Sequence, residues 1–118
     1  MVFVATGGID GVVAASELLS KRIGSQTIYR VFGGEAQALG KSWTPTNPTS
    51  LSNYRNAAGL PNVNTGQFVI QGSVRKSNIL LQRAALPLDG NAGGVMEYII
   101  KNPNQIKIYG VYGVNPPF

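Results

Sequence analysis

The chain contains neither cysteine nor histidine among its 118 residues. A disulfide framework and a zinc site made of thiolate or imidazole are therefore excluded, as are a cysteine nucleophile and a Ser-His-Asp triad. A chain of this length can bury one hydrophobic core, but it is too short for a two-domain enzyme with an interdomain cleft. Any chemistry must come from carboxylates, cations, hydroxyls, amides and backbone dipoles.

Short apolar runs separated by glycine and proline indicate a β-rich domain. The spacing of apolar residues predicts one helix over 10–22, capped by Asp10. The polar stretch 40–64 is expected to be a long loop, and the glycines of 89–94 a flexible turn. The sequence therefore predicts an α+β fold that is small and β-rich, with a short N-terminal helix. Its strands are expected at 27–32, 67–71, 79–81, 96–100 and 105–111.

Basic residues outnumber acidic ones, with ten Lys plus Arg against five Asp plus Glu and a net charge of +5. The charges are spread evenly, so they permit a nucleic-acid or acidic partner without requiring one. No run of roughly 18 apolar residues occurs, and the first residues lack the basic region of a signal peptide. We therefore expect neither membrane association nor a classical signal peptide.

Arg30 lies in the middle of the first expected strand. Strand alternation places it on the same face as Ile28 and Phe32, between two bulky apolar groups. Burying this guanidinium without a partner would be costly. Two interpretations follow: Arg30 faces solvent on an edge strand, or it lies at the floor of a cleft that binds a carboxylate or a phosphate.

Two further features could bind a ligand. Glu97 opens a strand directly after a glycine loop, which fits either a positioned acid or a solvated carboxylate at a strand end. The only tryptophan, Trp43, lies between the hydroxyls of Ser42 and Thr44. Its indole is either a flat wall for a planar ligand or a core side chain that anchors the long loop.

Taken in order, Tyr29-Arg30, Ser42-Trp-Thr44 and Glu97-Tyr-Ile-Ile-Lys-Asn-Pro103 resemble the Arg, Ser-x-Thr/Ser and Glu motifs of ADP-ribosyltransferases. More narrowly, the chain resembles toxin domains at the C-termini of bacterial Rhs-type polymorphic toxins. The resemblance covers residues 27–118, and residues 1–26 are expected to be a connecting segment with the helix. The segments that carry the narrower resemblance are 29–34, 40–45, 53–61, 85–91 and 113–118.

The resemblance implies an ADP-ribosyltransferase-like fold that uses NAD as a substrate and no metal. It implies that Arg30 grips a phosphate or the nicotinamide-side ribose of NAD. Ser42, Trp43 and Thr44 would form the nicotinamide pocket. Glu97 would be the catalytic residue and would bind the ribose 2′-hydroxyl, because a carboxylate there favours the oxocarbenium-like transition state.

The implied function is an antibacterial toxin that transfers ADP-ribose from NAD to a target-cell protein, elongation factor Tu in the group it most resembles, and so blocks translation. Such a toxin is secreted or delivered into the target-cell cytoplasm. The chain departs from many transferases of the family at Val95, where they have Glu or Gln two residues before the catalytic Glu.

The resemblance also implies a cognate immunity protein, which we expect to be acidic and to cover the cleft near Arg30 and Glu97. Two alternatives to the transferase remain. One is an NAD glycohydrolase that depletes NAD. The other is a non-enzymatic domain that binds RNA or an acidic partner through Arg75, Lys76 and Lys107; under the transferase hypothesis, a nucleic-acid partner is not expected.

Overall fold

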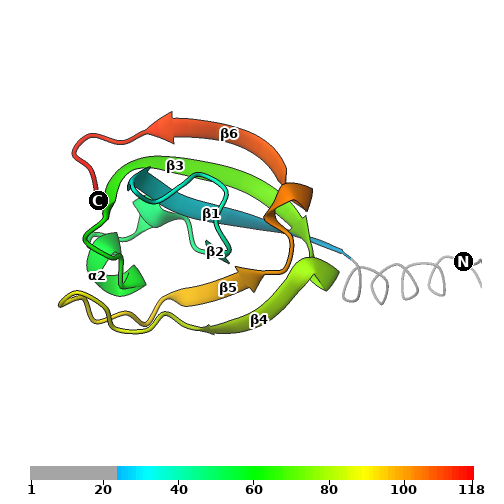
Figure 1. The fold of residues 1–118 in the computed structure, drawn as a ribbon, viewed down its shortest axis with the longest axis horizontal. Helices are drawn as coiled ribbons and strands as arrows, with labels where there is room; N and C mark the ends of the chain where they lie inside the picture. Colours follow the sequence, from blue (N-terminus) through cyan, green and yellow to red (C-terminus); the bar gives the residue numbers. More distant parts are fainter. Residues whose placement is uncertain (1–23) are drawn as a thin grey trace, which may run out of the picture.

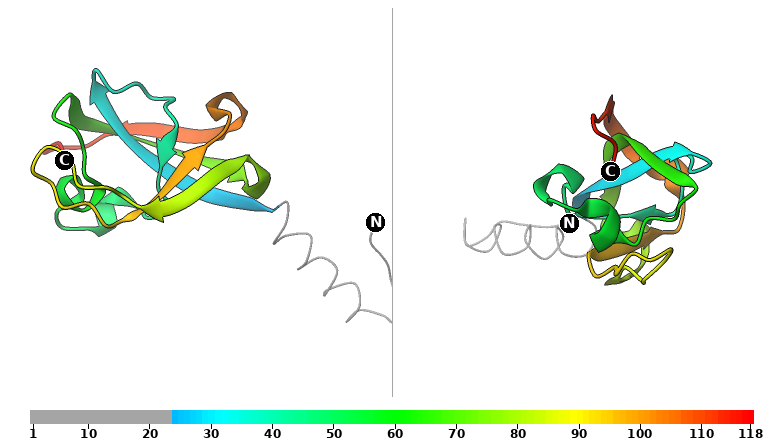
Figure 2. Two further views of the ribbon diagram at one scale, coloured as in Figure 1. Left: turned by 60° about the horizontal axis from the view of Figure 1, so that its bottom comes forward. Right: turned by 90° about the vertical axis from the view of Figure 1, so that its left-hand side faces the viewer.

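The computed structural model describes residues 24–118, which form two three-stranded antiparallel sheets (Figure 1). The first sheet has the order β1-β3-β6 and the second the order β2-β5-β4. Figure 2 shows these sheets from two further sides, with α2 beside the C-terminal end of the chain. The strands are β1 at Ser25–Gly34, β2 at Ser42–Trp43, β3 at Asn64–Arg75, β4 at Ile79–Ala84, β5 at Met96–Ile100 and β6 at Lys107–Gly113.

Helical structure within residues 24–118 is confined to short segments. Helix α2, Tyr54–Ala58, has five residues. The side chain of Asn53 caps its first turn by accepting a hydrogen bond from the Asn56 amide at 3.3 Å. Gly59 ends the helix in the left-handed conformation, with φ of 61°. The remaining helical segments are the 3-10 turns η1 at Pro48–Ser50, η2 at Lys76–Asn78 and η3 at Pro103–Gln105.

The expected fold class, an α+β ADP-ribosyltransferase-like fold with a short N-terminal helix, is wrong. Strand residues make up 48% of the structure and helical residues 15%. The α+β expectation depended on the helix over 10–22, which lies outside the described residues. No helix in 24–118 is long enough to cover a sheet, since α2 is little more than one turn. The described part of the chain is therefore a β-rich fold of two small antiparallel sheets.

The predicted positions of the individual strands agree with the structure better than the predicted fold class does. Each of the five expected strands overlaps an observed one, from β1, which begins at Ser25, to β6. The loop expected over 40–64 is wrong in part, because β2, η1 and α2 lie within it. The turn expected over 89–94 is present, and Asp89 has a positive φ of 51° there. In the part of the chain that the structure describes, no helix has the length and apolar character needed to cross a membrane.

Two buried clusters hold the fold together. The first joins the two sheets, and the second packs α2 and the residues after it onto the first sheet. Strand β1 contributes to both, because its side chains alternate between faces. The first cluster consists of Ile28, Trp43, Ile70, Val74, Ile100 and Ile106, and the second of Val31, Tyr54, Leu60 and Val69.

Candidate functional site

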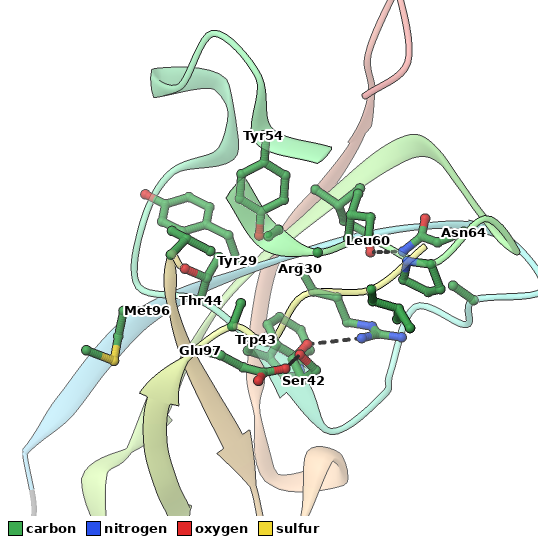
Figure 3. Close-up of a pocket in the computed structure, with 18 residues that line it drawn as sticks. Tyr29, Arg30, Ser42, Trp43, Thr44, Tyr54, Leu60, Asn64, Met96 and Glu97 are labelled. Atoms are coloured by element: carbon green, nitrogen blue, oxygen red, sulfur yellow. Dashed lines mark hydrogen bonds between the residues drawn. The ribbon is translucent and has the colours of Figure 1, made fainter. Parts of the chain in front are cut away.

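A pocket of about 250 Å³ lies where β1, β2 and β5 meet α2 (Figure 3). Arg30 of β1, Ser42 of β2 and Glu97 of β5 all line it, although they are far apart in the sequence. The structure therefore brings the predicted guanidinium, hydroxyl and carboxylate together. Although β1 is an edge strand of the first sheet, Arg30 lines the pocket rather than facing open solvent.

Ser42 links the two charged residues of the pocket. Its backbone carbonyl accepts a hydrogen bond from Arg30 Nη1 at 3.0 Å, and its hydroxyl donates one to Glu97 Oε2 (Figure 3). Ser42 pairs with Ile99 across β2 and β5. Because Ile99 and Glu97 lie on the same face of β5, the Ser42 hydroxyl is on the correct side to reach the carboxylate. Guanidinium, serine and carboxylate thus form one connected wall.

The loop between β1 and β2 wraps around the Arg30 guanidinium. Arg30 Nε donates to the Gln37 carbonyl at 2.9 Å, in addition to the bond to the Ser42 carbonyl. Both acceptors are neutral, and the single ion pair found within residues 24–118 does not involve Arg30. Burial lowers the pKa of Arg30, and Tyr54 opposes this shift, but an arginine side chain stays protonated. The pocket therefore holds a positive charge that a phosphate could neutralise.

Glu97 supplies the carboxylate of the pocket. Its side chain is 17% exposed, so it is not the solvated strand-end carboxylate of the alternative interpretation. Oε1 accepts a hydrogen bond from Arg83 Nε at 2.9 Å, and Oε2 accepts one from Ser42. A carboxylate has about four lone-pair positions, so these two bonds fix its orientation and leave room for a ligand hydroxyl.

Trp43 and Thr44 support the site from behind. Trp43 is 1% exposed, and its Nε1 donates to the Gly40 carbonyl at 2.7 Å. The interpretation of Trp43 as a core side chain therefore fits this structure, in which its indole offers almost no surface to a planar ligand. Thr44 is 2% exposed and bridges to Tyr29 through two backbone hydrogen bonds of 2.8 and 2.9 Å. This bridge ties the second sheet to the first beside the pocket.

Tyr54 is a pocket residue that the sequence reasoning missed. Its hydroxyl is directed into the pocket (Figure 3), and its ring packs edge-on against Phe118 with 5.5 Å between centroids. Burial raises the pKa of Tyr54, the negative charge of Glu97 raises it further, and the positive charge of Arg30 opposes the rise. The hydroxyl thus stays protonated and is available as a hydrogen-bond donor. The sequence signal was Asn53 followed by Gly59, the two caps of α2.

The raised pKa of Tyr54 predicts a loss of stability in alkali. Above the ordinary tyrosine pKa of 10.0, the unfolded chain releases this proton while the folded chain keeps it. The unfolded state then binds fewer protons, so the free energy of unfolding falls as the pH rises. Relative to Tyr54→Phe, we expect wild type to lose up to about 1.4 kcal/mol per pH unit above about pH 10.

Urea unfolding at about pH 8, 10 and 11 measures this difference. Tyr109→Phe is the matched control, because Tyr109 is 57% exposed. Its pH profile should parallel that of wild type. If the free energy of unfolding depends on pH in the same way for wild type and Tyr54→Phe, then the Tyr54 hydroxyl is not buried beside Glu97 as described.

The basic residues that were predicted to bind RNA or an acidic partner in the non-enzymatic alternative lie outside the pocket. Arg75 and Lys76 lie where β3 ends and η2 begins, and Lys107 pairs with Ser73 in the same region of the first sheet. None of the three lines the pocket. Within residues 24–118 the structure also shows no cluster of three side chains suited to hold a metal ion.

Comparison with known proteins finds no matching family model, no matching curated protein and no matching solved structure. The resemblance to ADP-ribosyltransferase toxins therefore remains a prediction.

Proposed function

We propose that this chain cleaves the bond between nicotinamide and ribose in NAD and transfers the ADP-ribose to a protein acceptor. The observation that carries the proposal is the convergence of Arg30, Ser42 and Glu97, from three different strands, on one pocket. NAD has an anionic diphosphate and a ribose that becomes cationic as its bond to nicotinamide breaks. A guanidinium can bind the anionic diphosphate, and a carboxylate in the same pocket can stabilise the cationic ribose.

Glu97 would act on the ribose. When the bond to nicotinamide breaks, its electron pair leaves with the positively charged ring, which departs as neutral nicotinamide without needing a general acid. The ribose carbon is left with oxocarbenium-like positive charge. A carboxylate held against the ribose interacts more strongly with this charge than with the ground state, and so lowers the barrier. Ser42 and Arg83 hold Glu97 in one orientation for this task.

Arg30 would act on the diphosphate. Its Nε and Nη1 are held by carbonyls of the loop and of Ser42, so the guanidinium is positioned before a ligand arrives. Positioning in advance reduces the entropy lost on binding. Tyr54 would add a hydroxyl donor from the α2 side of the pocket.

The wider role that we propose is that of an antibacterial toxin domain. Modification of a translation factor such as elongation factor Tu in the target cell would block translation, and an acidic immunity protein would protect the producing cell. The support for this role is the resemblance of the quoted segments, together with the net charge of +5 and the unpaired Arg30 in the pocket. An acidic partner that covers the pocket would neutralise that charge.

Purified protein incubated with labelled NAD and a bacterial lysate tests the proposal. We expect nicotinamide release together with label on at least one lysate protein, identified by mass spectrometry, and no label with Glu97→Gln. Free ADP-ribose in step with nicotinamide, with no labelled protein, would instead favour the NAD glycohydrolase. Absence of nicotinamide release with folded wild-type protein would refute both forms of NAD cleavage.

A substitution at Gly40 tests whether NAD binding depends on the position of the Arg30 guanidinium, without removing any charged group. A Cβ at Gly40 would lie 2.5 Å from Arg30 Cζ and 2.9 Å from Nη1, so Gly40→Ala should push the flexible guanidinium aside. We expect the KM for NAD to rise about tenfold, which corresponds to about 1.4 kcal/mol of lost binding. Steady-state kinetics measure the change. Gly110→Ala is the control, because a Cβ at Gly110 would meet nothing within 4 Å; an unchanged KM in Gly40→Ala would argue against a role of Arg30 in binding.

A further inference from the structure

Arg83 lies directly beside the proposed catalytic carboxylate. It pairs with Glu97 across β4 and β5, so both side chains project from the same face of the second sheet. Arg83 Nε lies 2.9 Å from Glu97 Oε1, and the Arg83 side chain is 43% exposed against 17% for Glu97. Arg83 is not itself among the residues that line the pocket, but its guanidinium extends from the partly buried Glu97 carboxylate toward solvent and so places a positive charge at the rim beside Glu97.

The chemistry of transfer brings the acceptor to this rim. Glu97 must lie against the ribose whose carbon becomes positive, and the acceptor must form its new bond to that same carbon. An acceptor side chain therefore comes close to Glu97, and so to the guanidinium that is hydrogen-bonded to it. Arg83 is thus within reach of whatever group attacks the ribose.

The surroundings of the carboxylate offer nothing to neutralise a cationic acceptor. Glu97 can still accept a hydrogen bond from a ligand hydroxyl, but its single negative charge is already paired with Arg83. The other acidic residues in the described part of the chain, Glu35 and Asp89, do not line the pocket. The lining residues next to Glu97 on β5 and just before it are the apolar Met96 and Val95. An arginine or lysine side chain would therefore meet the like charge of Arg83 with no second carboxylate among the lining residues to compensate for it.

We propose that Arg83 determines acceptor specificity by excluding cationic side chains, so that ADP-ribose is transferred to an uncharged or acidic side chain. This inference rests on the proposed transferase function. In the transfer, a lone pair of the acceptor oxygen or nitrogen forms a bond to the ribose carbon. The bond to nicotinamide breaks, and its electron pair leaves with nicotinamide. A hydroxyl or amide acceptor then loses its proton to water, whereas a carboxylate has none to lose.

The test measures how released ADP-ribose is divided between water and a cationic acceptor. The full chain is incubated with NAD and agmatine, a small guanidinium compound, and the ADP-ribosylated agmatine formed per nicotinamide released is determined. We expect a ratio below about 1 in 100 for wild type, and a rise of about tenfold or more for Arg83→Gln, because Glu97 is then free to attract the guanidinium. Arg75→Gln, which removes a charge outside the pocket, should match wild type.

A ratio does not depend on how much of the variant is folded, so it separates specificity from stability. Mass spectrometry of lysate proteins modified by wild type should find ADP-ribose on uncharged or acidic side chains. Modification of arginine or lysine side chains, efficient use of agmatine by wild type, or an unchanged ratio in Arg83→Gln would each overturn the inference while leaving NAD cleavage intact. Failure of the proposed transferase function itself would be recognised by the absence of nicotinamide release, or by nicotinamide release without any labelled lysate protein.

Discussion

Replacing Glu97 by glutamine should reduce the rate of nicotinamide release by about 10³-fold or more, while changing NAD affinity by less than about threefold. Glutamine keeps the size of the side chain and a carbonyl oxygen that can accept the hydrogen bond from Ser42. It lacks the negative charge that stabilises the cationic ribose in the transition state. The loss should therefore fall on kcat rather than on binding.

Nicotinamide release followed by chromatography, together with calorimetric titration of NAD, separates these two effects. Glu35→Gln is the matched control, since Glu35 is exposed and lies outside the pocket lining. The folded state of Glu97→Gln should survive, because an ion pair with the exposed Arg83 contributes at most about 1 kcal/mol. Activity of Glu97→Gln within about tenfold of wild type would rule out Glu97 as the residue that stabilises the ribose cation.

Replacing Trp43 by alanine should destabilise the protein by about 3–5 kcal/mol. Trp43 is 1% exposed and is the largest fully buried side chain in the described residues. Its removal leaves a cavity between the two sheets, and it also leaves the Gly40 carbonyl without its hydrogen bond from the indole. Domains of this size are stable by about 5–15 kcal/mol, so a large share of the stability would be lost.

Urea unfolding measures this loss, with Trp43→Phe as the control that keeps most of the buried volume. The phenylalanine variant should lose much less stability than the alanine variant. Because Gly40 also lies against the Arg30 guanidinium, the alanine variant should bind NAD more weakly in its remaining folded fraction. A destabilisation of less than about 1 kcal/mol would show that Trp43 does not hold the sheets together.

Local patterns in the sequence were sufficient for the strands but not for the fold class. Alternating apolar residues and flanking turn residues predict β1, β3, β4, β5 and β6, because these signals act over a few neighbouring residues. Helix α2 was missed because it has only five residues and depends on its caps and on the packing of Tyr54 against Phe118, a contact distant in sequence. The α+β class depended on a helix over 10–22, which lies outside the described residues, and it was wrong because the described residues form two small antiparallel sheets with only short helical segments.

The sequence was sufficient to predict which residues form the site, but not how they are arranged in space. Arg30, Ser42 and Glu97 stand out by residue type and position, whereas their convergence requires the pairing of β2 with β5 and the bridge between β1 and Thr44. Arg83 was not assigned to the site for a related reason. Its position opposite Glu97 depends on the register of β4 with β5, which shifts between Ile79 and Leu81.

A crystal structure of Glu97→Gln with bound NAD tests most directly whether one dinucleotide contacts both ends of the pocket. We expect the diphosphate of NAD within hydrogen-bond distance of the Arg30 guanidinium, and a hydroxyl of the nicotinamide-side ribose against residue 97. NAD bound at another surface, or bound in the pocket with its diphosphate away from Arg30 and its ribose away from residue 97, would refute the proposed roles of Arg30 and Glu97.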